Sequence, residues 1–223
     1  MKPIDNIVPK ISDVSIVLIG KFNPSIFHPL WYQAQKLIRP EEADNATLGL
    51  AHPEISQFST DWFRMEVTRD RFFISTHNKA QYDALRDLVQ GTFEILCHTP
   101  MNQMGINRGL HFEMASNELE LLWNRLAPGT VLESIVSEPK LKTIILHGKR
   151  DDSESRGHIG IQMAPSAKIT NGIYIHINDH FEVEDEKQGA EKLIDILKAQ
   201  WGESEKRAEK ISNNVLRVVK NGR

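Results

Sequence analysis

Three histidines lie in short apolar runs in the C-terminal half of the chain: His147, His158 and His176. The runs read LKTIILHGK, GHIGIQMA and GIYIHIND, and the turn-rich segments RDDSESR and PSAKITN separate them. Imidazole nitrogens bind zinc and also donate or accept hydrogen bonds. If the three runs are neighbouring strands, these histidines could form a metal site or part of a ligand site.

The alternation of side chains predicts which residues of the three runs share a face. We expect an antiparallel meander. Symmetric turns about residues 152–153 and about residue 168 give paired residue numbers that sum to 305 and 336. One face is then wholly aliphatic or Met, and a slip of one residue would destroy it. This face holds Ile144, Leu146, Ile159, Ile161, Met163, Ile173, Ile175 and Ile177.

The opposite face of the meander is predicted to be polar. With these registers His147 lies opposite His158, and His176 lies on the diagonal from His158, within reach of long side chains. Gly160 leaves a hollow that a ligand could approach. The candidate ligand-binding residues on this face are His147, His158, His176, Asn178, Tyr174, Gln162 and Arg156.

Three interpretations of this polar face stay open. It is the solvated face of an antiparallel sheet, or it binds a protein partner or a small anionic ligand, or His147, His158 and His176 bind zinc. No HExxH motif supports the metal. We therefore expect no cofactor, with zinc as the alternative.

A second group of polar residues lies in the segment HTPMNQMGINRGLHFEM, residues 98–114. The first part is predicted to be a loop in which polar side chains cap backbone groups at a junction, with ligand binding as the alternative. The second part is predicted to be a strand with Asn107, Gly109 and His111 on one face. The secondary candidate residues are His98, Asn102, Gln103, Asn107, Arg108 and His111.

Catalytic motifs are absent from the sequence: it contains no GxSxG, no GxxxxGK[ST] and no GxGxxG. The single cysteine, Cys97, excludes an intrachain disulfide, and we expect a buried, inert thiol. We therefore predict a non-enzymatic binding or regulatory subunit. The alternatives are a metal-dependent hydrolase of the zinc type and a nucleic-acid-binding accessory protein. The net charge of −3 argues against nucleic acid, and the basic residues Arg64, Arg69 and Arg71 lie among acidic ones.

The N-terminal half is predicted to contain elements in the order βαββαβ. These are a strand over 15–22, a helix from Pro29 that ends before Pro40, a hairpin over 62–76, a helix over 79–96 and a strand over 106–114. Residues 40–59 are expected to be loop with at most one short element. The order is that of ferredoxin-like domains. The fold class is therefore predicted as α+β, with a ferredoxin-like unit over 1–115.

Residues 116–223 are predicted to form a second unit, separate from or fused with the first. It holds a linking helix with Ser116 as N-cap, the meander, and a long helix from about 184 with a kink or restart at Gly202. Leu193, Leu197 and Trp201 are expected to cover the aliphatic face. The part after Gly202 is expected to pack across a homodimer boundary or on the first unit.

The N-terminal residues include no apolar segment typical of a signal peptide, and no apolar stretch approaches membrane-spanning length. We expect a cytoplasmic protein without a membrane partner.

Overall fold

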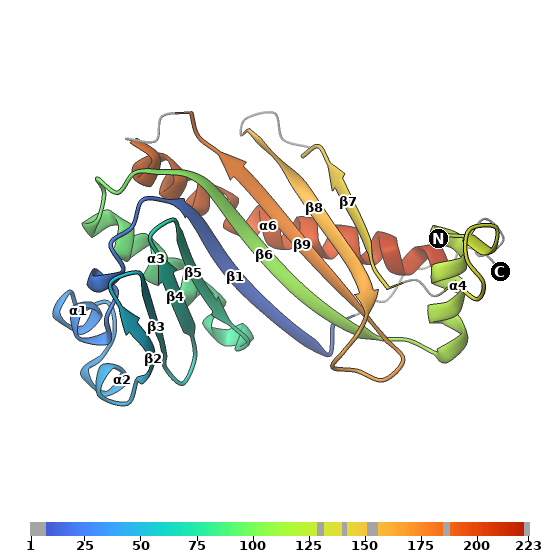
Figure 1. Ribbon diagram of the computed structural model, residues 1–223, viewed down its shortest axis with the longest axis horizontal. Helices are drawn as coiled ribbons and strands as arrows, with labels where there is room; N and C mark the ends of the chain where they lie inside the picture. The colour runs from blue at the N-terminus through green and yellow to red at the C-terminus, as the bar shows by residue number, and fades with distance from the viewer. Residues whose placement is uncertain (1–7, 129–131, 140–141, 151–155, 185–187, 221–223) are drawn as a thin grey trace.

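The computed structural model describes residues 8–128, 132–139, 142–150, 156–184 and 188–220. Its strands form one antiparallel sheet of nine, in the order β2-β3-β4-β5-β1-β6-β9-β8-β7 (Figure 1). The strands are β1 Ile11–Gly20, β2 Thr47–His52, β3 Ile55–Ser59, β4 Arg64–Thr68, β5 Arg71–Thr76, β6 Met101–Glu113, β7 Ile144–Gly148, β8 Gly157–Pro165 and β9 Gly172–Glu182. The α-helices are α1 Pro29–Ala34, α2 Pro40–Asp44, α3 Tyr82–Ile95, α4 Ser116–Leu126 and α6 Gly189–Lys220, and short 3-10 helices cover Pro24–Ile26 and Lys79–Gln81.

The predicted mixture of helix and strand is confirmed, but the ferredoxin-like unit is not. Strands β4, β5, β1 and β6 are neighbours in that order, as a ferredoxin-like sheet requires. However, the connection from β1 to β4 holds two short helices and the strands β2 and β3 instead of one helix. The sheet also continues from β6 into β9, so the four strands do not form a separate sandwich.

Several expected boundaries in the N-terminal half are wrong. Residues 40–59 form α2, β2 and β3 instead of loop, and α1 ends at Ala34 instead of near Pro40. Strand β6 begins at Met101, so residues 101–105, which were expected in a loop, belong to the sheet. In α4, Ala115 is the N-cap and Ser116 is the first helical residue. Pairing along the whole length of β1 explains the early start of β6.

The meander is confirmed, with registers that differ from the expected ones. The paired residue numbers sum to 307 for β7–β8 and to 338 for β8–β9, two more than expected in each case. A shift of two keeps every side chain on its predicted face but changes its partner. The aliphatic face is therefore as predicted. On β9, however, His158 lies opposite His180 instead of Asn178, and on β7 His147 lies opposite Gly160 instead of His158.

Helix α6 is continuous through Gly202, so the expected kink is wrong. It runs behind the sheet along its long axis (Figure 1). Its first half packs with α3, β1 and β6, and includes Leu193, Leu197 and Trp201. Its second half, including Ala208 and Leu216, covers the aliphatic face of the meander. The first half was expected on the meander and the second half elsewhere, so the two positions are exchanged. The apolar side of the second half, from which a homodimer was predicted, packs within the chain.

The apolar residues around the first half of α6 and those around its second half form two hydrophobic clusters on one sheet. The expected domain boundary near residue 115 stays a hypothesis. A buried ion pair links the helix layer to the sheet, between Arg207 on α6 and Asp179 on β9.

Within the described residues, none of the helices has the length and apolar character needed to cross a bilayer.

Candidate functional site

The sheet face opposite α3 and α6, here called the open face, has no described helix in front of β1, β6, β9, β8 and β7 (Figure 1). Small residues occupy its middle: Ser15 and Ser75 on one side, and Gly105, Gly109 and Gly160 on the other. A Cβ atom at Gly160 would have only one neighbour closer than 4.0 Å, the Cβ of Asn178 at 3.6 Å. The open face is therefore hollowed where larger side chains would fill it.

A groove of about 720 Å³ lies on the open face, in the size range of small-molecule sites. It is here called the Asp13 groove. Its lining combines aromatic rings, hydroxyl groups and charged or imidazole side chains from β1, β3, β4, β5, β9 and the loops beside them. The lining residues are Asp13, Ser15, Ser59, Thr60, Asp61, Trp62, Phe63, Arg64, Phe73, Ser75, Thr76, His77, Asn78, Tyr174 and His176.

Asp13 is the central charge of this groove. Its carboxylate lies over Gly109, whose added Cβ would be 2.6 Å from the Oδ2 atom. Its side chain is half-buried and accepts no hydrogen bond from any described residue. Its negative charge acts to raise the pKa of three nearby side chains, Tyr174, His111 and His176. A partly exposed carboxylate without a donor from the described residues can accept a hydrogen bond from a ligand.

Two histidines beside Asp13 are held in the neutral form. Burial lowers the pKa of His176, and Asp13 opposes this shift. Burial also lowers the pKa of His111, with Lys168 acting in the same direction. Neutral imidazoles offer one donor and one acceptor each.

The ring of His111 stacks on that of Tyr174, with centroids 4.6 Å apart. Its Nδ1 is 2.8 Å from the hydroxyl of Ser166. That hydroxyl already accepts hydrogen bonds from the backbone N–H groups of Lys168 and Ile169, which stabilise the β8–β9 turn. Ser166 therefore holds the ring of His111 in place, and its oxygen is not available as a nucleophile.

A second group lies further along the open face. The rings of His147 and His158 are stacked with centroids 4.9 Å apart, and those of His158 and His180 are 4.6 Å apart. The Nε2 atom of His180 is 3.2 Å from Oε1 of Glu182. Burial and the neighbouring His158 lower the pKa of His180, while Glu182 raises it. We call His158, His180 and Glu182 the His–Glu cluster, because their ligand atoms lie within 4.8 Å of one another.

The structure brings together most of the candidate residues from the meander, although not in the expected rows. His147 lies opposite Gly160 and Asn178, and His176 lies opposite Gln162 and beside Tyr174. The expected trio of His147, His158 and His176 is therefore not the histidine group that forms: His180 takes the place of His176. Arg156 is ion-paired with Glu184.

The secondary candidates separate into three places. His98 is exposed in the loop before β6, whereas Asn102 and Gln103 lie in β6 and do not cap a helix. Asn107 faces Asn178 across the open face. Arg108 is buried on the helix side, where it donates to the carbonyl of Trp201, and burial lowers its pKa. His98 to Pro100 thus lie in a loop as expected, whereas the residues from Met101 to Gly105 are paired in the sheet instead of forming a loop junction.

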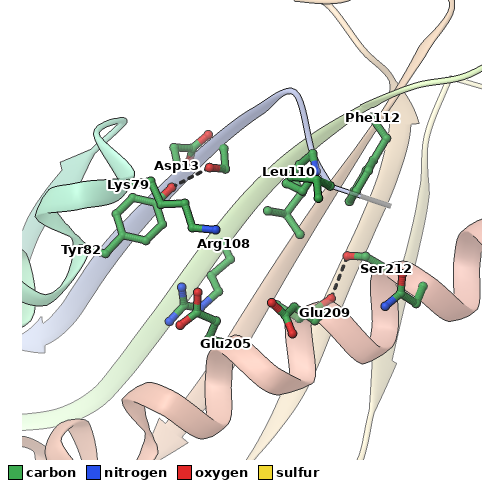
Figure 2. Close-up of a pocket in the computed structure, with 14 residues that line it drawn as sticks. Asp13, Lys79, Tyr82, Arg108, Leu110, Phe112, Glu205, Glu209 and Ser212 are labelled. Carbon is green, nitrogen blue, oxygen red and sulfur yellow. Dashed lines mark hydrogen bonds between the residues drawn. The ribbon is translucent and has the colours of Figure 1, made fainter. Parts of the chain in front are cut away.

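A smaller pocket lies on the helix side, with a volume of about 120 Å³ (Figure 2). Figure 2 shows Asp13 and Tyr82 on one side of it, and Arg108 and Glu205 on the other. The hydroxyl of Tyr82 donates to Ser12 at 2.9 Å. This volume suits a few water molecules and not a drug-sized ligand. Among the described residues, Asp13 is the one that lines both this pocket and the Asp13 groove.

Two further expectations concern single residues. Cys97 is exposed, so the expected burial of its thiol is wrong, because α3 ends at Ile95 and leaves it in a loop. The three arginines of the nucleic-acid alternative each form an ion pair with a glutamate: Arg64 and Arg71 with Glu66, and Arg69 with Glu54. These pairs reduce the positive charge available for phosphates.

Sequence reasoning missed the residues that β1, β5 and the end of β9 contribute. No sequence motif marks Asp13, Ser15 or Ser75 as site residues. They lie on the same face as His176 only because strands distant in the sequence pair with one another. Glu182 had a local signal: it alternates with His180 beyond the expected strand end at Asp179. No family model matches the sequence, and no curated protein matches it significantly.

Proposed function

We propose that the protein is a non-enzymatic binding protein that holds a small polar ligand in the Asp13 groove. The observation that carries this proposal is the half-buried carboxylate of Asp13, which accepts no hydrogen bond from any described residue. The carboxylate can therefore accept a hydrogen bond from a ligand, and hydrogen bonds to charged groups are stronger than those between neutral groups.

The lining of the groove suggests the class of ligand. Asp61 adds a second carboxylate, and aromatic surface comes from Trp62 in the β3–β4 loop and Tyr174 on β9. Arg64, the cation among the described lining residues, is already near Glu66 at 3.6 Å. This balance favours a ligand with amine or hydroxyl groups over the anion expected from the meander alone. Aromatic faces attract cations as well.

Binding instead of catalysis is supported by the arrangement of hydroxyl groups. The described hydrogen bond between a serine and a histidine, Ser166 to His111, involves a hydroxyl that a turn already occupies. An activated nucleophile needs a hydroxyl that is free to attack and a base beside it. The proposed role is therefore recognition by fixed polar groups.

Ligand-observed NMR with a panel of primary amines, polyamines and polyols tests this proposal. Asp13→Asn should weaken binding of the responding compounds by about tenfold or more, because a hydrogen bond to a charged group contributes roughly 1.5–3 kcal/mol. Asp195→Asn, on the exposed side of α6, is the matched control and should bind as the wild type does. The proposal is wrong if no compound binds or if Asp13→Asn binds equally well.

Self-association through the edge strand β7 is a second candidate. β7 ends the sheet of the described residues, and Ile145 and Leu146 on it are 61% and 49% exposed. Open edges with apolar side chains pair readily with another strand. Light scattering should show a dimer that Ile145→Lys converts to a monomer. A wild-type monomer at high concentration would exclude this candidate.

A further inference from the structure

We propose that the His–Glu cluster of His158, His180 and Glu182 binds a divalent transition-metal ion of the zinc class. One ligand atom from each side chain lies within 4.8 Å of the other two. The site lies on the open face, and His180 is four residues along β9 from His176, roughly 13 Å away. The metal site is therefore separate from the Asp13 groove.

The backbone register places the three side chains together. His158 and His180 are direct partners across β8 and β9. Glu182 follows His180 by two residues, so it lies on the same face of the sheet. Two strands of a continuous sheet thus hold all three groups, and metal binding requires only rotation of side chains.

The donor set suits zinc. Zinc binds imidazole nitrogen and carboxylate oxygen at about 2.0–2.2 Å, so the ligand atoms of a tetrahedral site are about 3.4 Å apart. Nε2 of His180 and Oε1 of Glu182 are already 3.2 Å apart. Two imidazoles and one carboxylate leave a fourth position for water on the open side. Such a nitrogen–oxygen set also accepts Co²⁺, Ni²⁺ and Cu²⁺.

The surrounding charges act on a bound cation in both directions. Arg150 donates to the carbonyl oxygen of His180, and its guanidinium lies over the ring of Phe181, 4.0 Å from the centroid. The positive charge of Arg150 acts on His180 and opposes a cation there, whereas the carboxylate of Glu182 favours one. Arg156 is ion-paired with Glu184, whereas the carboxylate of Glu182 contacts the imidazole of His180. The ring of His147 stacks on that of His158 and shields its outer side.

The test uses full-length protein without a polyhistidine tag, stripped of metal with a chelator. Zn²⁺ is titrated against a chromophoric chelator, and Co²⁺ is added separately so that its visible absorption reports the ligand geometry. We expect one Zn²⁺ per chain and a tetrahedral or five-coordinate Co²⁺ spectrum. His180→Asn and Glu182→Gln should each weaken Zn²⁺ binding by about tenfold or more.

Two controls keep the test decisive. His52→Asn, at the exposed end of the edge strand β2, should bind Zn²⁺ as the wild type does. Circular dichroism of each variant without metal should match that of the wild type, which separates loss of the site from loss of the fold. Failure of the wild type to bind stoichiometric Zn²⁺, or unchanged binding in both cluster variants, would overturn the proposal.

Discussion

Arg207 on α6 donates a hydrogen bond from Nε to the fully buried carboxylate of Asp179 on β9, with 3.1 Å between nitrogen and oxygen. Another nitrogen of the same guanidinium donates to Gln200 at 2.8 Å. Asp179 lies among the apolar residues of β9, such as Ile177 and Phe181, where an unpaired charge would be costly. The pair therefore fixes the position of α6 along the sheet.

Removing one member of this pair should destabilise the protein strongly. Arg207→Ala leaves a buried negative charge without its partner, and we expect the free energy of unfolding to fall by about 3–5 kcal/mol. Urea unfolding followed by circular dichroism measures this change. Lys206→Ala is the neighbouring control: its ion pair with Glu203 is on the surface, where solvent screens it, and its loss should change stability far less than Arg207→Ala does. Equal effects of the two substitutions would contradict a stabilising role for the buried pair.

The two faces of the meander should respond differently to loss of an isoleucine side chain. Ile175 is fully buried against the second half of α6, and Ile175→Ala should cost about 2–5 kcal/mol. Ile145 points to the open face and is 61% exposed, so Ile145→Ala should change stability by less than about 0.5 kcal/mol. Chemical denaturation of both variants checks the assignment. A large loss for Ile145→Ala would show that the open face is covered.

Two glycines of the open face distinguish the Asp13 groove from the rest of the sheet. An added Cβ at Gly109 would lie 2.6 Å from Asp13, so Gly109→Ala must displace that carboxylate. We expect ligand binding to weaken by about tenfold while the fold is kept, because Ala suits a strand better than Gly. Gly160→Ala, whose Cβ meets only ordinary contacts, should bind as the wild type does. The measurement is NMR titration with a compound that responds in the amine and polyol panel, and an unaffected Gly109→Ala would argue against the groove.

The stability of the protein should fall as the pH is lowered through the ordinary histidine range. Burial holds the pKa of His176 below its usual 6.5, so the unfolded chain binds a proton that the folded chain does not. The stability from this group is complete above about pH 6.5 and declines below it. His111 acts in the same direction, and Asp13 opposes both shifts.

Thermal melting between pH 8 and pH 5 tests this dependence. The decline in melting temperature should be shallower in His176→Gln, which has no imidazole to protonate. His52→Gln, an exposed histidine, should follow the wild-type curve. An identical slope in His176→Gln and wild type would show that other groups cause the acid sensitivity.

The faces of the meander strands could be predicted from sequence, because side-chain direction depends only on local alternation. Ile173, Ile175 and Ile177 are buried as the alternation requires, and His158 and His176 lie on the other face. The same reasoning correctly separated His111 from Arg108 in β6. These assignments hold for any register that shifts by an even number of residues.

The partner of each residue was decided only by the tertiary structure. A shift of two residues keeps the alternation of apolar side chains, so the sequence could not exclude it. On β9 the shift places His180 instead of Asn178 opposite His158, and on β7 it places His147 opposite Gly160 instead of His158. The pairing of β6 with both β1 and β9 brings Asp13 from the start of the chain beside His176. No local pattern encodes such a contact, because it joins strands more than a hundred residues apart. Composition and alternation determined the two faces of the sheet, whereas the packing of distant strands determined the site.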